Sequence, residues 1–343
     1  MKIESTKILF AVLNWGLGHA TRSLPIIKKL LADDNEIIIA SSGDALILLK
    51  LEFPDINFIE LPDYNVNYSS KNIIFSAASQ FLKVLNVIKK ENTLTKEIVK
   101  KYRINQIISD NRYGIFHSEI NSIIITHQLN ILMPKGFEIF SPLAQRVNNK
   151  LLSNFNQIWI PDFQGENNLS GKLSSNKKIQ CPIKYIGPQS RFNKKDVDLD
   201  CNFNDYKYEF LAIISGPEPS RAQLEELVIN KFKVLDCKTA IVSGKMENQT
   251  ISKISNIDIF NHLKYADLEK LIGESKIIIC RSGYSSIMDL TTLQKKAILI
   301  PTSGQTEQEY LGRYHHGNGQ FIVVKESNFR LGNLTDLSRK LGF

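Results

Sequence analysis

The stretch IICRSGYSSIMDL, residues 278–290, decides the fold of this 343-residue chain. Its first residues are consecutive and apolar, which is typical of a parallel strand covered on both faces of a sheet. The run ends in Arg281-Ser282-Gly283, and small hydroxyl residues then open a helix that carries Asp289 one turn inside. A buried strand that passes through a short polar turn into a helix is the repeating unit of an open α/β sheet.

The same alternation extends through the rest of the chain in two series. In the first half it predicts strands at 7–12, 36–40, 57–61, 106–109, 122–126 and 157–160, with helices at 19–31, 45–51, 73–101 and 142–154. In the second half it predicts strands at 210–215, 239–243, 257–260, 276–280, 297–301 and 321–324, with helices at 219–235, 266–274, 285–293 and 307–315.

The alternation fades between the two series, in a charged stretch with little periodicity. We therefore predict a Rossmann-like domain over residues 1–188, an interdomain linker over 189–206 and a second Rossmann-like domain over 207–343. Ligands of doubly wound sheets bind at the carboxyl ends of the strands, so the loops after strands are the candidate sites.

Composition narrows the class of protein. The formal charge of +8 favours an anionic partner such as a nucleotide, an acidic lipid head group or nucleic acid. No apolar run approaches the roughly 20 residues of a spanning helix, and the first residues lack a signal-peptide pattern. We therefore expect a cytoplasmic protein whose four cysteines are reduced thiols: Cys181, Cys201, Cys237 and Cys280.

A glycine-containing loop, NWGLGHATR, follows the first strand at residues 14–22. The next helix directs its free N–H groups and positive dipole end at this loop, which suits an anionic or strongly hydrogen-bonding ligand. His19 lies in the first helical turn, where the dipole favours the neutral imidazole that can accept a proton. The alternative is a tight turn with His19 as a helix cap. The loop is not a dinucleotide fingerprint, because Arg22 stands where the third glycine would be.

A second group of polar loops is expected at one edge of the second sheet. Hydroxyls and N–H groups after residue 280 can hold phosphate oxygens, and Asp289 can accept hydrogen bonds from a ribose. An ordinary N-cap followed by a first-turn acid explains the same residues structurally. The loop TSGQTEQE (302–309) follows the next strand, and Ser215-Gly216 follows the first strand of this series.

These motifs resemble the GT-B glycosyltransferases related to the peptidoglycan N-acetylglucosaminyltransferase that makes lipid II. GLGHATRS (16–23) is similar to the family's opening loop, and CRSGYSSIMDL (280–290) with IPTSGQTEQEY (300–310) is similar to its donor-nucleotide motif. ITHQLN (125–130) and IGPQSR (186–191) extend the resemblance over both halves. The resemblance implies two Rossmann-like domains that face each other across a cleft. It also implies inverting, metal-independent transfer of a hexose or N-acetylhexosamine from a UDP-sugar to a glycan or lipid-linked hydroxyl, in cell-envelope glycan synthesis.

The resemblance also assigns residues to roles. His19 is the candidate for activating the acceptor hydroxyl or for contacting the diphosphate, with Asp110 as a rival base. The donor residues are Gly18, Arg191, Ser215, Gly216, Arg281, Ser282, Gly283, Ser285, Ser286, Asp289, Gln308 and Glu309. The acceptor loops depart from the family, since NWGLG (14–18) replaces its fuller glycine loop and SDNRYG (109–114) replaces a second one. We place the acceptor at Asn14, Trp15, Asn111, Arg112, His127 and Gln128.

Several alternatives accompany this interpretation. A UDP-sugar 2-epimerase shares the architecture and the donor, whereas a dinucleotide oxidoreductase is disfavoured by the incomplete fingerprint. A nucleic-acid-binding protein ranks low because no aromatic-basic motif appears. We expect no metal, since the acidic run DVDLD (196–200) falls in the predicted linker, and no cofactor besides the UDP-sugar substrate. The basic amphipathic segment 73–103 is interpreted as a helix facing its own core or, alternatively, as a peripheral contact with an anionic membrane.

Overall fold

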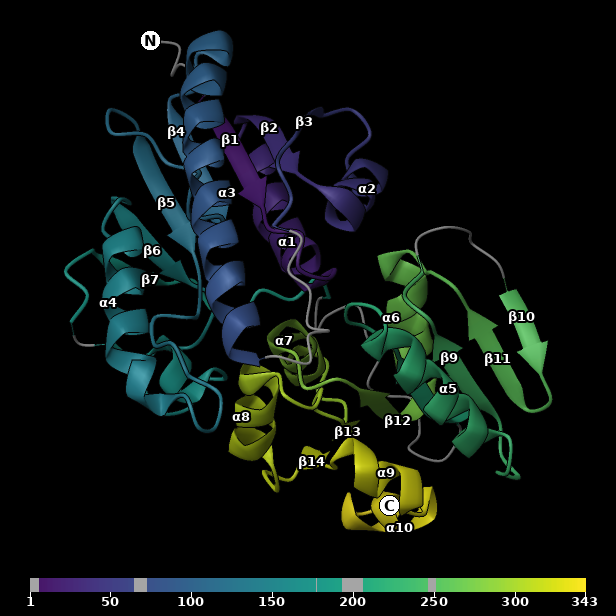
Figure 1. Cartoon of the computed structure of the whole chain (residues 1–343). Coiled ribbons are helices and arrows are strands. Elements are labelled where there is room, and N and C mark those ends of the chain that lie inside the picture. Colours follow the sequence, from purple (N-terminus) through teal and green to yellow (C-terminus); the bar gives the residue numbers. More distant parts are fainter. Residues whose placement is uncertain (1–5, 65–72, 177, 193–205, 246–250) are drawn as a thin grey trace. The chain divides into compact units, whose positions relative to one another are not determined.

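The computed structural model describes residues 6–64, 73–176, 178–192, 206–245 and 251–343 (Figure 1). The chain divides into two compact units, each with its own sheet. The N-terminal unit comprises Met1–Ile131, Phe140–Asn168 and Lys172–Gly187, and the C-terminal unit comprises Leu132–Ile139, Leu169–Gly171 and Pro188–Phe343.

The N-terminal unit is built on a seven-stranded parallel sheet with the order β3-β2-β1-β4-β5-β6-β7. The chain starts at β1, moves outward to β3, and then returns to the other side of β1. This reversal places a topological switch point between β1 and β4, where ligands of such sheets bind. The strands are β1 (Lys7–Val12), β2 (Glu36–Ser41), β3 (Asn57–Glu60), β4 (Gln106–Asp110), β5 (Asn121–Ile125), β6 (Gln157–Ile160) and β7 (Ile183–Tyr185).

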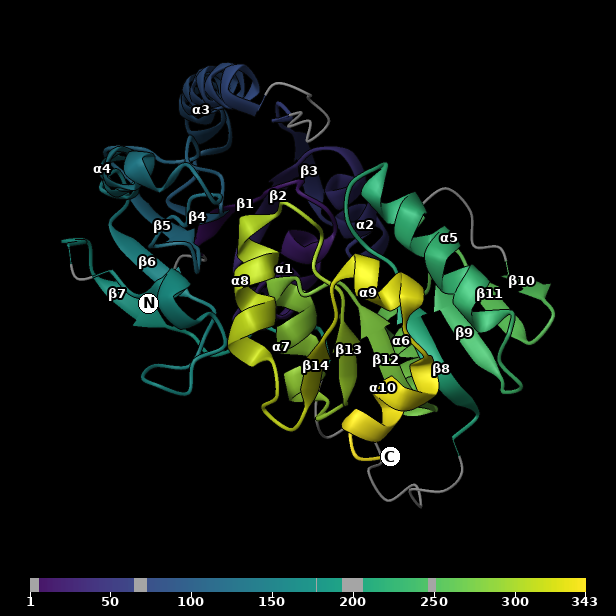
Figure 2. The same ribbon diagram turned by 60° about the horizontal axis from the view of Figure 1, so that its bottom comes forward.

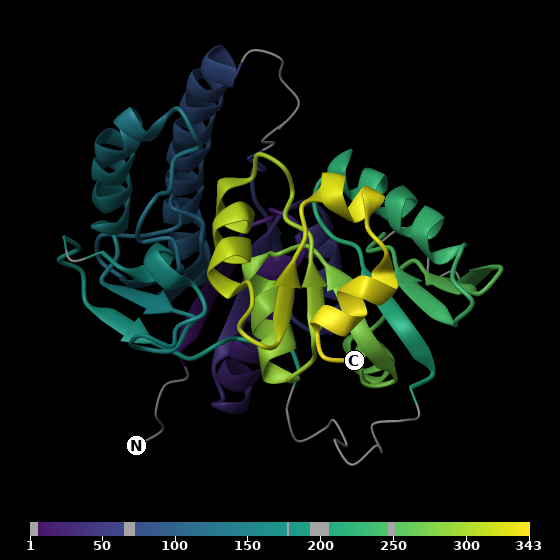
Figure 3. The ribbon, with the colours of Figure 1, turned by 90° about the horizontal axis from the view of Figure 1, so that it is seen from below.

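Helices cover both faces of this sheet. On one face, alternate residues of β1, Leu9 and Ala11, pack with Ile98 of α3 in a buried apolar cluster. On the other face, α1 contacts β1 and β2 and also packs against α2. Figure 3 shows α3 (blue) and α1 (purple) on opposite sides of the sheet. The helices are α1 (Gly18–Ala32), α2 (Gly43–Glu52), α3 (Ile73–Tyr102) and α4 (Ser141–Leu152), with short 3-10 turns η1 (Glu138–Phe140) and η2 (Gly171–Ser174).

The C-terminal unit repeats this plan with the order β10-β11-β9-β8-β12-β13-β14, which can be followed in Figure 2. All its neighbouring strands are parallel except β10 and β11, which form an antiparallel hairpin at one edge. The switch point lies between β8 and β12. The strands are β8 (Tyr208–Ile213), β9 (Thr239–Val242), β10 (Ile251–Ile254), β11 (Ile257–Phe260), β12 (Ser275–Cys280), β13 (Ala297–Leu299) and β14 (Phe321–Val323).

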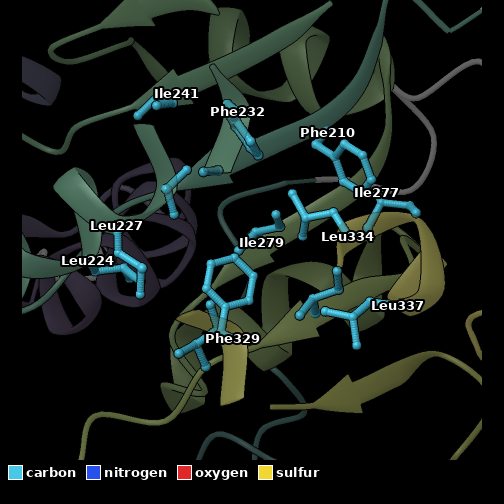
Figure 4. Close-up of a cluster of buried hydrophobic side chains, with 14 of the residues drawn as sticks. Phe210, Leu224, Leu227, Phe232, Ile241, Ile277, Ile279, Phe329, Leu334 and Leu337 are labelled. Atoms are coloured by element: carbon cyan, nitrogen blue, oxygen red, sulfur yellow. The ribbon is translucent and has the colours of Figure 1, made fainter. Parts of the chain in front are cut away.

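One face of the second sheet carries the apolar core shown in Figure 4. Phe210 and Ile277 of the sheet pack there with Phe232 of α5, Phe329 of α9 and Leu334 of α10. Burying one such side chain stabilises the fold by about 1.5–3 kcal/mol. The helix α7 also buries apolar side chains: Ile287, Met288 and Leu290. The helices are α5 (Ser220–Phe232), α6 (Tyr265–Gly273), α7 (Tyr284–Thr292), α8 (Thr306–His315), α9 (Glu326–Leu331) and α10 (Leu334–Lys340).

The two doubly wound units confirm the predicted fold class, and the predicted helices differ from the observed ones by no more than a few residues at either end. Sequence periodicity missed four short elements: β7, β10, α9 and α10. The strand β10 is exposed along its whole length, so it carries no apolar pattern that periodicity could detect. Of the predicted linker, residues 189–192 belong to the C-terminal unit, whereas residues 193–205, including the acidic run 196–200, lie outside the described residues.

Candidate active site

A buried charged cluster lies at the switch point of the N-terminal sheet. Asp110 is the last residue of β4, and His19 is the second residue of α1, which follows β1. Because β1 and β4 are neighbours, the loops after them meet at the same edge. The Nδ1 atom of His19 lies 2.8 Å from Oδ1 of Asp110. The structure thus brings together the two residues that the sequence offered as rival bases.

The Asp110 carboxylate is bound from several directions. Arg22 donates from Nε to Oδ2 at 2.8 Å and also from Nη2 to Oδ1, while Ser23 donates from Oγ to Oδ2 at 3.0 Å. His19, Arg22 and Ser23 are three and four residues apart on α1, so they share one helix face. Arg22 also approaches the loop after β5, where its Nη1 lies 3.4 Å from Nδ1 of His127. The two hydrogen bonds from Arg22 to Asp110 fix the carboxylate in one orientation.

The charges of this cluster set its protonation. Burial raises the pKa of Asp110, but the positive charge of Arg22, the charge of His19 and their hydrogen bonds outweigh burial and hold the pKa well below its usual range. Burial and then the charge of Arg22 lower the pKa of His19 below its ordinary value, although the charge of Asp110 opposes them. Near neutral pH the pair is therefore an ionised Asp110 beside a neutral His19.

This protonation state fixes the tautomer of His19. An ionised carboxylate only accepts hydrogen bonds, so Nδ1 of His19 carries the proton that it donates to Asp110. The lone pair is then on Nε2, and the His19 side chain keeps 14% of its surface exposed, whereas Asp110 has none. A neutral imidazole whose ring is oriented in this way can accept a proton at Nε2 from a hydroxyl group.

Arg112 was predicted to contact the acceptor, and in the structure its guanidinium binds groups of the protein. Its guanidinium is completely buried and forms an ion pair with Glu91 of α3 at 2.8 Å. It also donates to the carbonyl oxygens of Val12 and Pro62 and, at 2.6 Å, to the hydroxyl of Ser42. Arg112 therefore fastens the ends of three strands to α3, and sequence alone could not reveal that its partners would enclose it.

The other predicted acceptor residues occupy the same edge of the sheet in different ways. Asn14 donates to Asp63 at 2.7 Å and accepts from the backbone N–H of Ala45, so it ties its loop to the start of α2. Trp15 is 44% exposed beside it. After β4 and β5, the buried or half-buried residues are Asn111, His127 and Gln128.

In the C-terminal unit the loops after β8, β12 and β13 also meet at one edge, but most of their polar side chains bind the protein itself. The hydroxyl of Ser282 donates to the carbonyl oxygen of Gln308 at 2.8 Å. The side chain of Gln308 accepts from the N–H of Thr302, and that of Glu309 accepts from the N–H of Gly304. Gln308 and Glu309 thus shape the 301–305 loop from α8.

Arg281 is a second predicted ligand contact whose guanidinium binds groups of the protein. Its guanidinium, predicted to lie near a diphosphate, is 1% exposed at the residue level and turns toward the protein. It pairs with Glu326 at 2.8 Å and donates to the carbonyl oxygens of Ser220 and Ile300. Arg281 therefore holds the starts of α5 and α9 against the end of β13, and acts on the site through these elements.

The start of α7 is the part of this edge that suits an anion. Gly283 is the N-cap and provides no side-chain hydrogen bond to the helix, and Ser285 and Ser286 follow in the first turn. Free N–H groups at a helix start, together with the helix dipole, bind phosphate oxygens. Across the β8 end, Ser215 precedes Gly216, whose φ of +112° is a conformation that side chains rarely adopt.

Asp289 lies further along α7 with two partners from the first residues of the predicted linker. Ser190 donates to Oδ1 at 2.7 Å, and Nε of Arg191 lies 3.3 Å from Oδ2. Burial raises the pKa of Asp289, while Arg191 and Ser190 oppose that shift. The sequence prediction placed Arg191 and Asp289 in one donor site, and the structure brings them together.

Sequence reasoning missed functional neighbours in both units. Arg22 was noted only as a departure from a fingerprint, although its position three residues after His19 on one helix was a usable signal. His262 lies in the loop after β11, and burial and the nearby charge of Arg191 lower its pKa. No spacing links His262 to Arg191, because 71 residues and several elements separate the two positions.

Known proteins resemble this chain in its fold and in the sequence of one domain. The fold is that of GT-B glycosyltransferases. The chain aligns over 99% of its length with 91% of the calicheamicin glycosyltransferase CalG4 at a TM-score of 0.66 and 10% identity. It aligns over 98% with 91% of MurG from Acinetobacter baumannii at a TM-score of 0.56 and 13% identity. Residues 221–341 match the model of the glycosyltransferase family 28 C-terminal domain.

Curated relatives agree with this assignment. A UDP-N-acetylglucosamine–N-acetylmuramyl-(pentapeptide) pyrophosphoryl-undecaprenol N-acetylglucosamine transferase of Legionella pneumophila is 25% identical over 149 residues. That match covers 41% of this chain and only 40% of the relative's length. An uncharacterized glycosyltransferase of Methanosarcina acetivorans is 20% identical over 317 residues, 88% of this chain and 81% of the relative. These matches confirm the resemblance noted from the sequence motifs.

Among the described residues, none of the helices combines the length and the hydropathy of a membrane-spanning segment. In the same ranges, no three or more His, Cys, Asp or Glu side chains gather in a way that could hold a metal ion.

Proposed function

We propose that the protein is an inverting glycosyltransferase that moves a hexose or N-acetylhexosamine from a UDP-sugar to a hydroxyl of a glycan or lipid-linked acceptor. The observation that carries the proposal is the His19–Asp110 pair, in which a fully buried carboxylate orients a partly exposed, neutral imidazole. The family 28 domain at residues 221–341 supports a nucleotide sugar as the donor. The proposal makes the N-terminal unit the source of the base and the C-terminal unit the donor site.

The proposed reaction is a single displacement at the anomeric carbon. Nε2 of His19 removes the proton from the acceptor hydroxyl as its oxygen attacks the anomeric carbon. The bond from that carbon to the diphosphate oxygen breaks, and the electron pair leaves with UDP. The resulting imidazolium is stabilised by Asp110, which stays ionised because Arg22 and Ser23 hold it. Asp110 is thus assigned as the residue that positions His19, and not as the base.

The departing diphosphate needs positive potential that does not depend on a cation. In the proposal this comes from the uncapped start of α7 at Gly283, Ser285 and Ser286 and from Arg191. Arg281 contributes by holding the loops, as its buried contacts indicate. Asp289 accepts hydrogen bonds from the ribose, in exchange for part of its contact with Ser190.

The first test is a thermal-shift screen of nucleoside diphosphates and nucleotide sugars. The proposal expects UDP and at least one UDP-sugar to raise Tm, in the presence of a chelator and without added metal. Failure of UDP and of every UDP-sugar would remove the donor assignment. Incubation with UDP-N-acetylglucosamine alone then separates the epimerase alternative, which requires a changed UDP-sugar without an acceptor. The comparisons do not favour that alternative, since the matched domain is of glycosyltransferase type.

A cytoplasmic location at the inner membrane face, in cell-envelope glycan synthesis, is part of the proposal because of the lipid-linked acceptor. The packing of α3 leaves few of its described apolar side chains for contact with a membrane. Val87 and Ile88, which the sequence placed on the apolar face, are buried in a core cluster with Leu13 and Tyr64. Leu82 remains 67% exposed, whereas the side chains of Phe75 and Phe81 lie outside the described residues. Flotation with anionic vesicles tests the contact, and no binding would remove it.

A further inference from the structure

A second histidine, His127, borders the buried charged cluster on the side of Arg22. It lies in the loop after β5, whose last residue Ile125 is the register partner of Asp110 on β4. His127 is buried, with 4% of its surface exposed, and Arg22 beside it keeps only 2%. The Nη1 atom of Arg22 lies 3.4 Å from Nδ1 of His127. The loop after β5 therefore brings a second imidazole into contact with the cluster.

The contact with Arg22 fixes the tautomer of His127. A guanidinium carries only N–H donors and stays protonated in proteins, so Nδ1 of His127 is the acceptor. The imidazole of His127 is therefore neutral, with its proton on Nε2. His19 has the opposite tautomer, because its Nδ1 donates to the ionised Asp110. One ion pair, Arg22–Asp110, thus holds the two histidines of the cluster in opposite tautomers.

The guanidinium of Arg22 is shared between the two partners. Its Nε and Nη2 donate to the two oxygens of Asp110, and its Nη1 faces His127. A planar guanidinium has its donors in one rigid fork, so an acceptor at Nη1 also sets the direction of the other two nitrogens. The place of this charge matters for His19 as well, since burial and then the charge of Arg22 lower the pKa of its imidazole.

We infer that His127 is a positioning residue for the proposed base, and not a contact of the acceptor. Its neutral imidazole accepts from Arg22 and keeps the guanidinium in the orientation in which it binds both oxygens of Asp110. That carboxylate then holds His19 with the proton on Nδ1 and the lone pair on Nε2. The inference rests on the proposed function, in which Nε2 of His19 accepts the proton of the acceptor hydroxyl.

The first test observes the tautomers directly, by ¹⁵N NMR of protein labelled at its six histidines. Long-range ¹H–¹⁵N correlations of each imidazole ring distinguish a protonated nitrogen from one with a lone pair. At neutral pH, without donor or acceptor, the wild type should carry the proton of His19 on Nδ1 and that of His127 on Nε2. The signals are assigned by their loss in His19→Ala and in His127→Leu.

The second test compares two replacements of His127. His127→Leu removes the acceptor of Arg22, whereas His127→Asn keeps one, because a carboxamide oxygen can stand at the place of Nδ1. In H127L the tautomers of His19 should become mixed, and kcat should fall about 10-fold with KM for the acceptor within about 2-fold of the wild type. H127N should keep the tautomer of His19 and retain kcat within about 3-fold.

His117→Leu is the matched control. The Nδ1 atom of His117 is also an acceptor, bound by the backbone N–H of Glu119, but the residue is half-buried and outside the cluster. H117L should leave the tautomer of His19 and kcat unchanged. If H127L does not fold, the wild-type tautomers and H127N still decide the question.

The inference is overturned if His127 of the wild type carries a proton on Nδ1, or if H127N loses as much kcat as H127L. It is also overturned if H127L raises KM for the acceptor and leaves kcat unchanged, which would make His127 an acceptor contact. A purely structural role would lower Tm in H127L without changing the tautomer of His19. Absence of transfer from every UDP-sugar removes the proposed function, whereas the NMR measurements still decide whether His127 positions His19.

Discussion

The carboxyl edges of the two sheets are built from the same topology but use their polar groups differently. At the N-terminal edge, side chains form a buried charged cluster in which one imidazole nitrogen of His19 is left for chemistry. At the C-terminal edge, backbone groups of neighbouring loops and helices bind the side chains of Arg281, Ser282, Gln308 and Glu309. The same edge holds the start of α7, whose N-cap Gly283 provides no side-chain hydrogen bond.

This difference matches two chemical tasks. Proton transfer requires a titratable side chain with a fixed tautomer, and Asp110 fixes that of His19. Holding a diphosphate requires several donors at fixed positions, which a braced loop and a helix start provide without any titratable group. A doubly wound sheet can therefore serve either task. The task depends on whether the side chains of its loops are directed at the ligand or bind the loop backbone.

The largest effect is expected from replacing the imidazole. His19→Ala should lower kcat about 10²- to 10⁴-fold, because the acceptor hydroxyl loses its general base. UDP binding should be unchanged, since the donor site belongs to the other unit. His117→Ala is the control, as His117 is half-buried and outside the cluster. Steady-state kinetics with UDP-sugar and a competent acceptor measures the effect, and an unchanged kcat would remove His19 from the mechanism.

The next effect is on stability and tests whether Arg112 holds the fold together through its ion pair with Glu91. Arg112→Ala leaves the fully buried Glu91 without its ion-pair partner, so the free energy of unfolding should fall by about 3–5 kcal/mol. Urea unfolding measures this change, and Lys89→Ala, on the exposed side of α3, serves as the control with almost no change. A variant as stable as the wild type but with weakened acceptor binding would restore the original acceptor assignment.

A smaller effect is expected on the affinity for the ribose of the nucleotide. Asp289→Asn keeps a hydrogen-bonding side chain but loses the charge, so the Kd of UDP should rise about 10-fold. The preference for UDP over 2′-deoxy-UDP should shrink by the same factor. Calorimetric titration measures both, with Asp267→Asn, an exposed first-turn acid of α6, as the control. An undiminished preference for UDP would place the ribose elsewhere.

The smallest effect is a displacement of the pH profile. The active form of His19 is neutral, and its pKa is lowered from the model-peptide value of about 6.5. The midpoint of the acid limb should therefore lie below pH 6.5, while Asp110 stays ionised throughout. The profile of kcat/KM for the acceptor tests this in the wild type and in H117A. A midpoint of the acid limb at or above pH 6.5 would contradict a His19 pKa lowered by burial and by the charge of Arg22.

The fold was predictable because consecutive apolar residues such as Ile277, Ile278 and Ile279 reveal strands buried on both faces. Short elements escaped prediction where burial gives no pattern, as in the exposed strand β10. The local structure of residues 275–292 was also predictable, because a strand, a Ser-Gly turn and a helix are contiguous in sequence and their geometry is local. Asp289 and Arg191 meet only in the fold, yet the resemblance placed both in one site.

The parts of the site that sequence could not predict depend on where long side chains turn. Arg112 and Arg281 were both assigned to ligands, and both point inward to partners contributed by distant elements, Glu91 and Glu326. A charged residue in a polar loop has the same sequence signature in either case. The roles of His19 and Asp110 were left open for a similar reason, because the proposed choice between them depends on Arg22, which binds Asp110.

The central claim is that a nucleotide-binding edge and a His19-centred acid–base cluster divide the work between the two units. Calorimetric titration of UDP into the wild type, H19A and D289N tests it most directly. The account predicts that UDP binds the wild type and H19A with the same Kd and binds D289N about 10-fold more weakly. It is contradicted if UDP does not bind the wild type, or if H19A loses binding while D289N retains it.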